Sequence, residues 1–423
     1  MIKIYHSADD FFKNRKPFPD YLDAVADSVR SIIQSVRERG DAALKEFSVK
    51  FDNADLQTFR MNAEQIEKAK KALSPELQAI LLEAANNVRE FHKKELPVSW
   101  LDESTDGTKL GQKYTPVERA GVYIPGGTAA YPSSVLMNVI PAQIAGVKEI
   151  VAISPPRSAG EIHPMVLASL ALLGIDEIYA LGGAHGIAAL AYGTETIPRV
   201  FKITGPGNAY VMEAKRQVFG QVGIDSLAGP TELVVIADNS ANPAFVARDM
   251  MAQAEHDPHA MTVLITNSAD LAERVAAKLT QFTATAKRKE ILKESLGNHG
   301  AAVFVNDLRE AAAVSNEIAP EHLEIMTKSD EAVVEKITNA GAIFWGEYSS
   351  EPVGDYWAGP NHILPTNGTA KFSSPLGVMD FMKHSSLIHY SKERLMKHAV
   401  KIEKIARLEG LDNHSKSVEV RHE

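Results

Sequence analysis

Between residues 120 and 230 the sequence repeatedly places an apolar run, a glycine-rich turn and a helical pattern one after another. The repeat is clearest at 121–127 (G-V-Y-I-P-G-G), 177–186 (E-I-Y-A-L-G-G-A-H-G) and 200–208 (V-F-K-I-T-G-P-G-N). Strands that alternate with helices are typical of parallel β-α units. In such units ligands bind at the carboxyl ends of strands, and anions bind at helix N-termini. The repeat therefore predicts an α/β fold, and further strands are expected at 233–238, 262–266 and 302–305.

Glycines stand where these expected strands end. Their position favours a phosphate-bearing cofactor, although tight turns alone would need the same residues. No complete G-x-G-x-x-G occurs, because G-P-G-N-A-Y at 205–210 holds only the first two glycines of that pattern. Both interpretations stay open on the pattern alone. The glycines concerned are Gly126, Gly127, Gly182, Gly183, Gly205 and Gly207.

The two flanks of this region carry helical patterns. From residue 21 to about 91 apolar residues recur every three or four positions, and Ser74-Pro75 marks a helix start. The polar segment 98–119 predicts strands and a domain boundary near residue 120. From Pro375 onward the spacing predicts helices again, and they lead into a polar tail that contains His414.

The composition narrows the class of partner. A net charge of −9 lacks the basic excess that nucleic acids or anionic membranes require. No signal peptide opens the chain and no apolar run approaches about 18 residues, so a cytoplasmic protein is expected. Cysteine is absent, which excludes Cys-ligated zinc and a thiohemiacetal intermediate. We therefore expect a small-molecule substrate and a metal, if present, held by His, Asp, Glu, Gln or Asn.

Gln253 and His256 lie near the end of an amphipathic run that begins at Asn242-Pro243, where Asn can cap a helix and Pro can occupy its first turn. Side chains three residues apart share one helical face, so these two could bind the same metal ion. Imidazole is a common ligand for a borderline metal, whereas a glutamine carbonyl is an unusual one. Periodicity alone favours a structural role for both at a helix end.

Two further segments carry candidate catalytic residues. Glu321 and His322 follow Pro320 at an expected helix-to-strand junction, where a turn could bring the two side chains together. Either could then act as a general base, although an isolated Glu-His pair is more simply a surface feature. The segment 349–366 is a long loop rich in Gly and Pro that contains Asp355 and His362. Loops of this length without a regular pattern are often functional.

Taken together, these segments resemble the histidinol dehydrogenase family. The resemblance covers most of the chain from about Gly40 onward. It implies an NAD-dependent four-electron oxidation of L-histidinol to L-histidine through histidinaldehyde, the last step of histidine biosynthesis. It also implies one Zn²⁺ per subunit and a homodimer with shared active sites. Six motifs in the order of the family carry it: G-V-Y-I-P-G-G, G-P-G-N-A-Y-V-M-E-A-K-R, A-G-P-T-E, Q-A-E-H-D, A-P-E-H-L-E and G-D-Y-W-A-G-P-N-H-I-L-P-T.

The resemblance also implies a role for individual residues. Glu321 and His322 fall on the acid–base pair. Thr231 stands where serine is frequent, which keeps the hydroxyl, and His185 stands where glutamine is usual. The implied zinc ligands are Gln253, His256, Asp355 and, from the other subunit, His414. The implied substrate contacts are Thr231, Gln253, His256, His322, Asp355, His362, Glu409 and His414, and the implied NAD contacts are Tyr123, His185 and Asn208.

The architecture expected on this basis is two β-α domains that resemble incomplete Rossmann folds, one inserted in the other. Small helical N- and C-terminal extensions would mediate dimerisation. The expected boundaries are 1–19 for the N-terminal extension, 20–120 with 232–374 for the zinc and catalytic domain, 121–231 for the inserted NAD domain, and 375–423 for the C-terminal helices and tail.

Other functions remain open from the sequence. A related dehydrogenase of a sulfonated diol could keep the metal and cofactor residues and change the substrate pocket. A zinc hydrolase could use the same His, Asp and Glu residues around a metal-bound water and would need no NAD. A catalytically silent dimeric binding protein is the third possibility, but retention of Glu321, His322 and every proposed ligand weighs against it.

Overall fold

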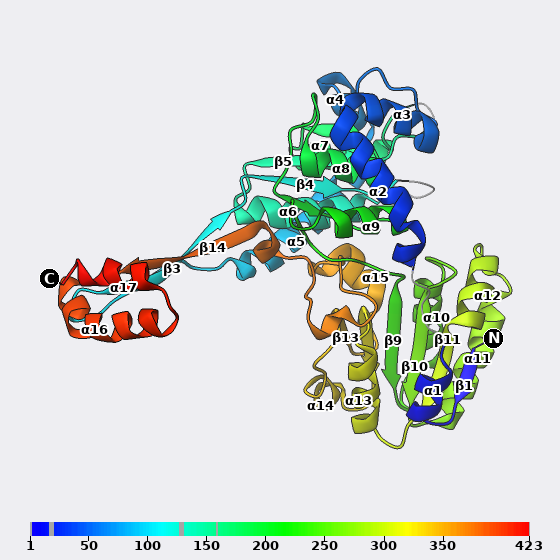
Figure 1. Ribbon diagram of the computed structural model, residues 1–423. Coiled ribbons are helices and arrows are strands. Elements are labelled where there is room, and N and C mark those ends of the chain that lie inside the picture. Colours follow the sequence, from blue (N-terminus) through cyan, green and yellow to red (C-terminus); the bar gives the residue numbers. More distant parts are fainter. Residues whose placement is uncertain (1, 17–20, 127–130, 158–159, 423) are drawn as a thin grey trace.

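The computed structural model describes residues 2–16, 21–126, 131–157 and 160–422. Gly127 of the first glycine-rich turn and the expected boundary at 19/20 lie outside the described residues. The described chain forms two α/β units and a slender arm that projects away from both (Figure 1). In these ranges no helix combines the length and apolar character needed to cross a membrane. The α/β class expected from the alternation is confirmed.

One unit is built on a six-stranded sheet in which every pairing is parallel. Its central strands are apolar on both faces because helices cover both sides, as is usual for parallel sheets. Leu233 and Val235 face one helical layer, and Val234 and Ile236 face the other. In spatial order the strands are β1 (Lys3–Tyr5), β11 (Gly300–Phe304), β10 (Met261–Thr266), β9 (Glu232–Ala237), β12 (His322–Met326) and β13 (Ala342–Trp345).

Six helices cover this sheet. Helices α10 (Pro243–Ala254), α11 (Ala269–Thr283) and α12 (Lys289–Asn298) form one layer. Helices α1 (Ala8–Asn14), α13 (Leu308–Ile318) and α14 (Asp330–Val334) lie on the other face. The expected Asn242-Pro243 start of α10 is confirmed, because the Asn242 side chain accepts a hydrogen bond from the Ala244 amide at 2.9 Å.

The second unit is built on a five-stranded parallel sheet. Gly205 closes its G-P-G turn with φ +115°, and a side chain there would collide with the backbone oxygen of Tyr123. Its strands, in spatial order, are β6 (Ile178–Ala180), β5 (Glu149–Ser154), β4 (Arg119–Tyr123), β7 (Lys202–Thr204) and β8 (Gly223–Ile224). Its helices are α6 (Pro132–Ala145), α7 (Pro164–Leu172), α8 (Gly183–Tyr192) and α9 (Ala209–Val218).

The N-terminal helices pack differently from the expected grouping. The sequence predicts residues 20–120 in the unit that contains 232–374, but these helices bury their apolar faces against the five-stranded sheet unit. Val29 and Ile33, for example, join the core that contains Val211. The expected N-terminal extension likewise contributes β1 to the six-stranded sheet. The helices are α2 (Tyr21–Arg39), α3 (Asp41–Asp52), α4 (Ala63–Ala72) and α5 (Pro75–His92), followed by a 3₁₀ turn at Lys93–Glu95.

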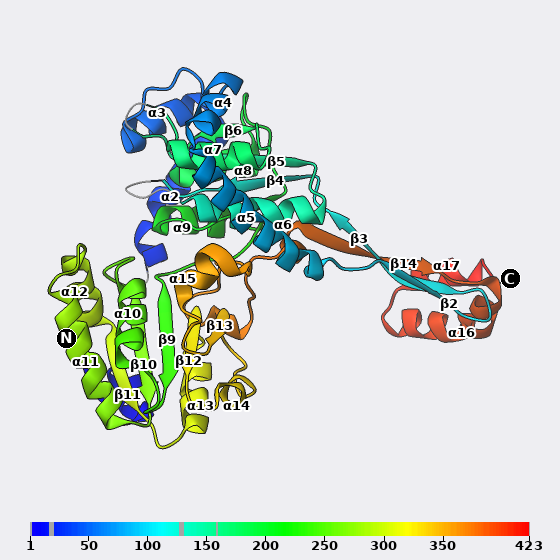
Figure 2. The same ribbon diagram turned by 180° about the vertical axis from the view of Figure 1, so that it is seen from behind.

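The arm is a three-stranded antiparallel ribbon that ends in two helices (Figures 1 and 2). Its strands are β2 (Trp100–Glu103), β3 (Lys109–Pro116) and β14 (Met382–His389), and its helices are α16 (Lys392–Leu408) and α17 (Asp412–Glu419). The expectation that helices resume at Pro375 is wrong for its first part. A 3₁₀ turn at Val378–Phe381 leads into β14, which pairs along its whole length with β3.

Candidate active site and metal centre

The candidate site residues gather at the amino ends of β9 and β12, not at the carboxyl ends where ligands of parallel sheets usually bind. Thr231 precedes β9, and Glu321 precedes β12, whose first residue is His322. The backbone turns into β12 through Ala319, which has φ +52° and caps α13, and through Pro320. This turn brings the adjacent Glu321 and His322 side chains together, as the sequence had suggested.

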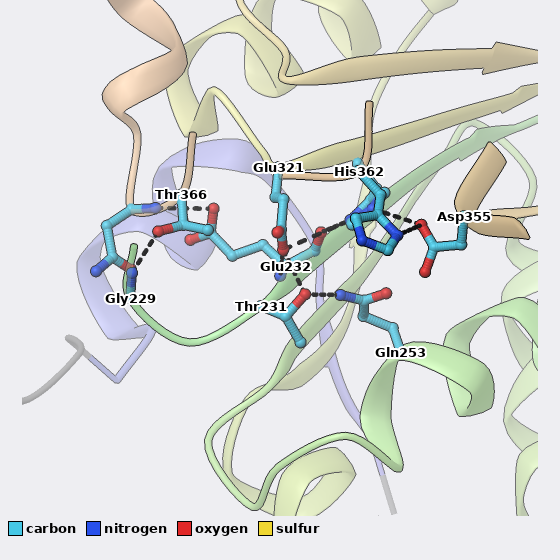
Figure 3. A network of polar contacts seen from close by, with 10 residues as sticks. Gly229, Thr231, Glu232, Gln253, Glu321, Asp355, His362 and Thr366 are labelled. Atoms are coloured by element: carbon cyan, nitrogen blue, oxygen red, sulfur yellow. Dashed lines mark hydrogen bonds and ion pairs between the residues drawn. The ribbon is translucent and has the colours of Figure 1, made fainter. Parts of the chain in front are cut away.

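Glu321 is nearly buried and its carboxylate is held from two sides. Its Oε2 accepts hydrogen bonds from the Thr231 hydroxyl and from the backbone nitrogen of Glu232, the latter at 3.0 Å (Figure 3). The Nδ1 of His322 lies 3.5 Å from the same oxygen. A carboxylate fixed in this way stands directly beside an imidazole, which is the arrangement that general acid–base chemistry requires.

His322 is buried, and three carboxylates surround its ring. Burial by itself lowers its pKa, but Glu321, Glu351 and Asp355 together raise the pKa well above the ordinary value for histidine. Its Nδ1 lies 3.2 Å from the backbone oxygen of Glu232, whereas its Nε2 is buried without a hydrogen-bond partner. The Nε2 therefore has a proton or a lone pair to offer to a ligand.

The loop at 349–366 supplies the opposite wall of the site. It is not wholly irregular, because a short helix α15 (Glu351–Val353) and a π-helical turn (Gly354–Ala358) carry the acidic residues. Asp355 Oδ1 lies 3.9 Å from His322 Nε2 and 3.8 Å from His362 Nδ1. Burial raises the pKa of Asp355, but the neighbouring histidines outweigh it and the pKa is lowered.

Gln253 is completely buried near the C-terminal end of α10. Its side-chain amide lies between the Thr231 hydroxyl and the Glu351 carboxylate; Figure 3 shows the Thr231 contact. Because the Thr231 hydroxyl donates its only proton to Glu321, the amide nitrogen of Gln253 donates to Thr231 Oγ1, and the carbonyl oxygen of Gln253 lies on the side of Asp355 (Figure 3).

His256 follows the end of α10 in a turn. Its backbone nitrogen donates to the backbone oxygen of Gln253 at 3.2 Å. Its side chain is exposed. It lies close enough to Asp355 for its positive form to lower the pKa of that carboxyl. Helix α10 ends before His256 and is therefore shorter than expected, and Gln253 and His256 lie near two different carboxylates of the site, Glu351 and Asp355.

The side chains present fit a divalent cation. In the part of the chain that the structure describes, His322, Glu351 and Asp355 offer ligand atoms that all lie within 4.8 Å of one another. Gln253 borders this group through Glu351. Nitrogen and oxygen donors of this kind suit zinc, and the buried Nε2 of His322 shows that the group is not closed by its own hydrogen bonds.

Two cavities meet the site. One of about 960 Å³ lies between the two units and is lined by Thr231 and His256 together with Asn208, which caps α9 on the five-stranded side. The other, of about 570 Å³, is lined by His322, Asp355 and His362. A residue expected to contact NAD and two expected to contact substrate thus share one cavity.

The other two expected NAD contacts are buried. The Tyr123 hydroxyl accepts a 3.4 Å hydrogen bond from the Gly183 amide, and burial raises its pKa. His185 is 1% exposed, packs against Phe47 and Phe51, and has its Nε2 3.4 Å from Asp52. In this structure neither ring lines the cavity that contains Asn208.

Glu409 and His414 lie in the arm. Glu409 caps the end of α16 and His414 belongs to α17. Both views place these helices at the far end of the ribbon from α15 (Figures 1 and 2). A single chain therefore does not bring these two residues to the other candidate ligands.

Sequence reasoning missed two buried acids at the site, Glu232 and Glu351. The available signal for Glu351 was its position four residues before Asp355, which places both on one face of a helical turn. Glu232 gave no signal beyond its place at the start of an apolar strand. Its carboxylate accepts a hydrogen bond from the Asn367 amide at 3.1 Å.

Glu232→Gln is expected to flatten the pH dependence of stability. Burial and the nearby Glu321 raise the pKa of Glu232 in the folded chain to about 8, above its ordinary value of 4.5. Between these values the folded state keeps a proton that the unfolded state has lost. Stability is therefore lost as pH rises, by an amount on the order of a few kcal/mol. Thermal midpoints at a series of pH values between about 5 and 9 should fall less in the variant than in the native chain.

Glu317→Gln is the matched control for that measurement, because Glu317 is exposed and pairs with Lys371 at the surface. Its midpoints should follow those of the native chain. An unchanged slope in Glu232→Gln would mean that Glu232 does not carry the dependence.

The sequence from residue 19 to 422 matches the model of the family described as histidinol dehydrogenase. A protein of that name from Bacillus licheniformis is 53% identical over 395 residues, which cover 93% of each chain. One from Bacillus subtilis is 52% identical over 394 residues, covering 93% of this chain and 92% of the relative. The crystal structure of histidinol dehydrogenase from Elizabethkingia anophelis superposes with a TM-score of 0.94 at 36% identity, covering 99% of this chain and 98% of that one.

Proposed function

Because the chain belongs to the histidinol dehydrogenase family of oxidoreductases, we propose that it oxidises L-histidinol to L-histidine through histidinaldehyde in the cytoplasm, using Zn²⁺ and two NAD. The observation that carries this proposal is the convergence of the Glu321–His322 pair with Asp355, His362 and Gln253 at the amino ends of β9 and β12. These residues lie far apart in the sequence and come from the start of β12, the end of α10 and the long loop.

His322 would act as the base for both oxidations. When bound, zinc would hold the imidazole and amino nitrogens of the substrate in a fixed orientation, and NAD would accept one hydride in each oxidation. The buried Nε2 of His322 has no hydrogen-bond partner, so the neutral ring can take the proton of the substrate alcohol there, and the carboxylates that raise the pKa of His322 favour this transfer. Asp355, 3.9 Å from this nitrogen, would stabilise the imidazolium that forms.

Glu321 would take a proton from water as that water adds to the aldehyde. The Thr231 hydroxyl and the Glu232 amide hold its carboxylate in place. The chain contains no cysteine, so the second oxidation passes through the hydrated aldehyde and not through a thioester. After His322 has released the first proton to solvent, it receives the proton of the hydrate as the second hydride leaves.

The cofactor would enter from the five-stranded unit. Asn208 at the start of α9 lines the same cavity as Thr231 and His256, and helix N-termini favour phosphate groups. The support for Tyr123 and His185 as direct contacts is weaker, because both side chains are buried. We therefore place the cofactor contact first on Asn208.

The functional unit would be a homodimer in which the arm of one protomer completes the site of the other. The arm leaves large apolar side chains uncovered, and an exposed apolar surface of this kind marks an interaction site. A second copy would cover this apolar surface. His414 and Glu409 would then reach the zinc ion and the substrate in the site of the other protomer, because they lie too far from the site of their own. The uncovered residues include Trp100, Leu110, Ile388, Ile405 and Leu408, which are 44% to 87% exposed.

Chelation should abolish turnover and zinc should restore it. The native protein is expected to form about two NADH for each L-histidinol consumed, because a four-electron oxidation requires two hydride transfers. After removal of the metal, NADH formation should fall by at least about 100-fold, since substrate orientation is lost. Absorbance of the reduced nicotinamide measures both quantities.

Two outcomes would replace this proposal. Turnover of dihydroxypropane sulfonate in preference to L-histidinol would favour the sulfonated-diol dehydrogenase. Metal-dependent turnover of a hydrolysable substrate without reduced nicotinamide would favour a zinc hydrolase.

A further inference from the structure

Lys215 and Asp225 form a buried ion pair that none of the roles above uses. Their side chains are only 1% and 3% exposed, and their charged groups are in direct contact. Lys215 lies on α9, whereas Asp225 directly follows β8. A buried pair of this kind often adds little stability compared with apolar side chains of similar size. Its contacts with the neighbouring backbone are therefore more informative about its role.

Both charged groups bind the backbone of the same residue, Gly205. The Nζ of Lys215 donates to the Gly205 carbonyl oxygen at 3.0 Å, and the Gly205 amide donates to Asp225 Oδ2 at 2.8 Å. Hydrogen bonds in which one partner is charged are stronger than those between neutral groups. The pair therefore holds the first residue of the G-P-G turn by both of its backbone polar groups.

The same pair links two chain segments that form one wall of the cavity between the units. The G-P-G turn continues into residues 207–209, and the chain after Asp225 continues into residues 227–232; both stretches line that cavity. The second stretch is also the connection from the five-stranded sheet to β9 of the six-stranded one. One further contact joins the two segments, a 3.3 Å hydrogen bond from the Ala228 amide to the sulfur of Met212 on α9, and sulfur is a weak acceptor. The ion pair is therefore the stronger link between the two segments.

We propose that Lys215 and Asp225 are positioning residues for the cofactor. They fix the G-P-G turn so that residues 207–209 line the cavity, with Asn208 and the start of α9 placed to bind the phosphates of the cofactor. Neither Lys215 nor Asp225 lines this cavity, so the pair would act through the turn without touching the cofactor. A displacement of a binding group by about 1 Å can reduce a rate on the order of 100-fold. This inference rests on the proposed use of NAD.

Lys215→Met separates a positioning role from a purely structural one. The variant loses the hydrogen bond to Gly205 and leaves the Asp225 carboxylate unpaired, so its thermal midpoint should fall. Binding of ADP-ribose, measured by titration calorimetry well below that midpoint, should weaken about 10- to 100-fold, the usual contribution of a hydrogen bond to a charged group. Zinc affinity should stay as in the native protein, because the candidate metal group lies in the other unit. Native affinity for ADP-ribose in the folded variant, or an equal loss of zinc affinity, would overturn the proposal.

Arg119→Met provides the matched control. Arg119 is also a buried cation of the five-stranded unit, and it pairs with the carboxylates of Glu149 and Glu177. It begins β4, at the opposite end of the sheet from the G-P-G turn. Its substitution should lower the thermal midpoint and leave the affinity for ADP-ribose unchanged. A loss of affinity as large as that of Lys215→Met would mean that any destabilisation of this unit weakens binding, and would contradict a specific role for the pair.

A double variant tests the pair even if Lys215→Met fails to fold. Lys215→Met with Asp225→Asn leaves no unpaired charge buried, so most of the thermal midpoint should be recovered. The affinity for ADP-ribose should nevertheless stay at least about tenfold below that of the native protein, because the Gly205 carbonyl has lost its charged donor. Recovery of native affinity together with stability would overturn the proposal. A native, zinc-loaded protein that binds neither NAD nor ADP-ribose would instead contradict the proposed function itself.

Discussion

Glu321→Gln is expected to divide the reaction into its two halves. Oxidation of histidinaldehyde should slow about 10²- to 10⁴-fold, the usual contribution of a general base, because an amide cannot take a proton from the attacking water. Oxidation of the alcohol should be largely spared, because its proton goes to His322. Single-turnover formation of NADH from L-histidinol and from histidinaldehyde, measured separately, would show the two rates.

The control for this variant is again Glu317→Gln, which removes a surface carboxylate paired with Lys371 and should leave both rates unchanged. Equal loss in the two half-reactions of Glu321→Gln would show that Glu321 does not act on water alone. Glu321 would then act in both oxidations, through its contacts with Thr231 and His322.

Two inactive variants are expected to restore activity to each other when they form a mixed dimer. Asp355→Asn should remove a metal ligand from the body of the protomer, and His414→Asn should remove one from the arm. Each homodimer should lose at least about 100-fold in turnover, with folding retained in His414→Asn. In the heterodimer one site combines a native body with a native arm. It should therefore show about half of the native activity in an isologous dimer.

Heterodimers isolated with two different affinity tags would give that measurement, together with their zinc content. A heterodimer of His414→Asn and Glu409→Gln is the control, because both substitutions lie in the arm and neither site then receives a native one. If Asp355 and His414 acted within one chain, the first heterodimer would stay inactive. Full zinc occupancy in the His414→Asn homodimer would also contradict the role of the arm.

The order of the elements could be predicted from the sequence, but the packing of the N-terminal helices could not. The glycine-rich turns near 121–127 and 200–208 follow buried apolar runs, and this local pattern predicts a strand before each turn. The parallel pairing of β4 with β7 confirms both strands. The apolar stripe that includes Val29 and Ile33 shows only which face of α2 is buried. Either sheet could have received such a face, because its spacing carries no information about the partner.

Strand β14 illustrates a second limit. Its sequence M-K-H-S-S-L-I-H lacks the regular alternation of a half-buried strand and follows apolar residues at helical spacing. It becomes a strand because it pairs with β3, for example Ser386 with Gln112. An interaction over such a separation along the chain overrides local preference.

The candidate site shows the same division. Glu321 and His322 could be selected as a pair because Pro320 ends a helix directly before them. Their contact with Thr231, and the approach of Asp355, depend on strands and loops that only the fold brings together. Glu351 was overlooked although it stands beside Asp355 on the same turn, because an isolated glutamate has no pattern that distinguishes it.

The first strand of the chain also affects how copies of the protein meet. β1 is only three residues long, carries Lys3, and covers β11 at one margin of the six-stranded sheet. Short, lysine-bearing edge strands resist the sheet-to-sheet pairing that leads to aggregation. Removal of residues 1–5 would leave the backbone N–H and C=O groups of Ala301–Val303 unpaired at the edge of the sheet. Another copy of the chain could then pair with this edge. We therefore expect β1 to limit edge-to-edge association between copies of this chain.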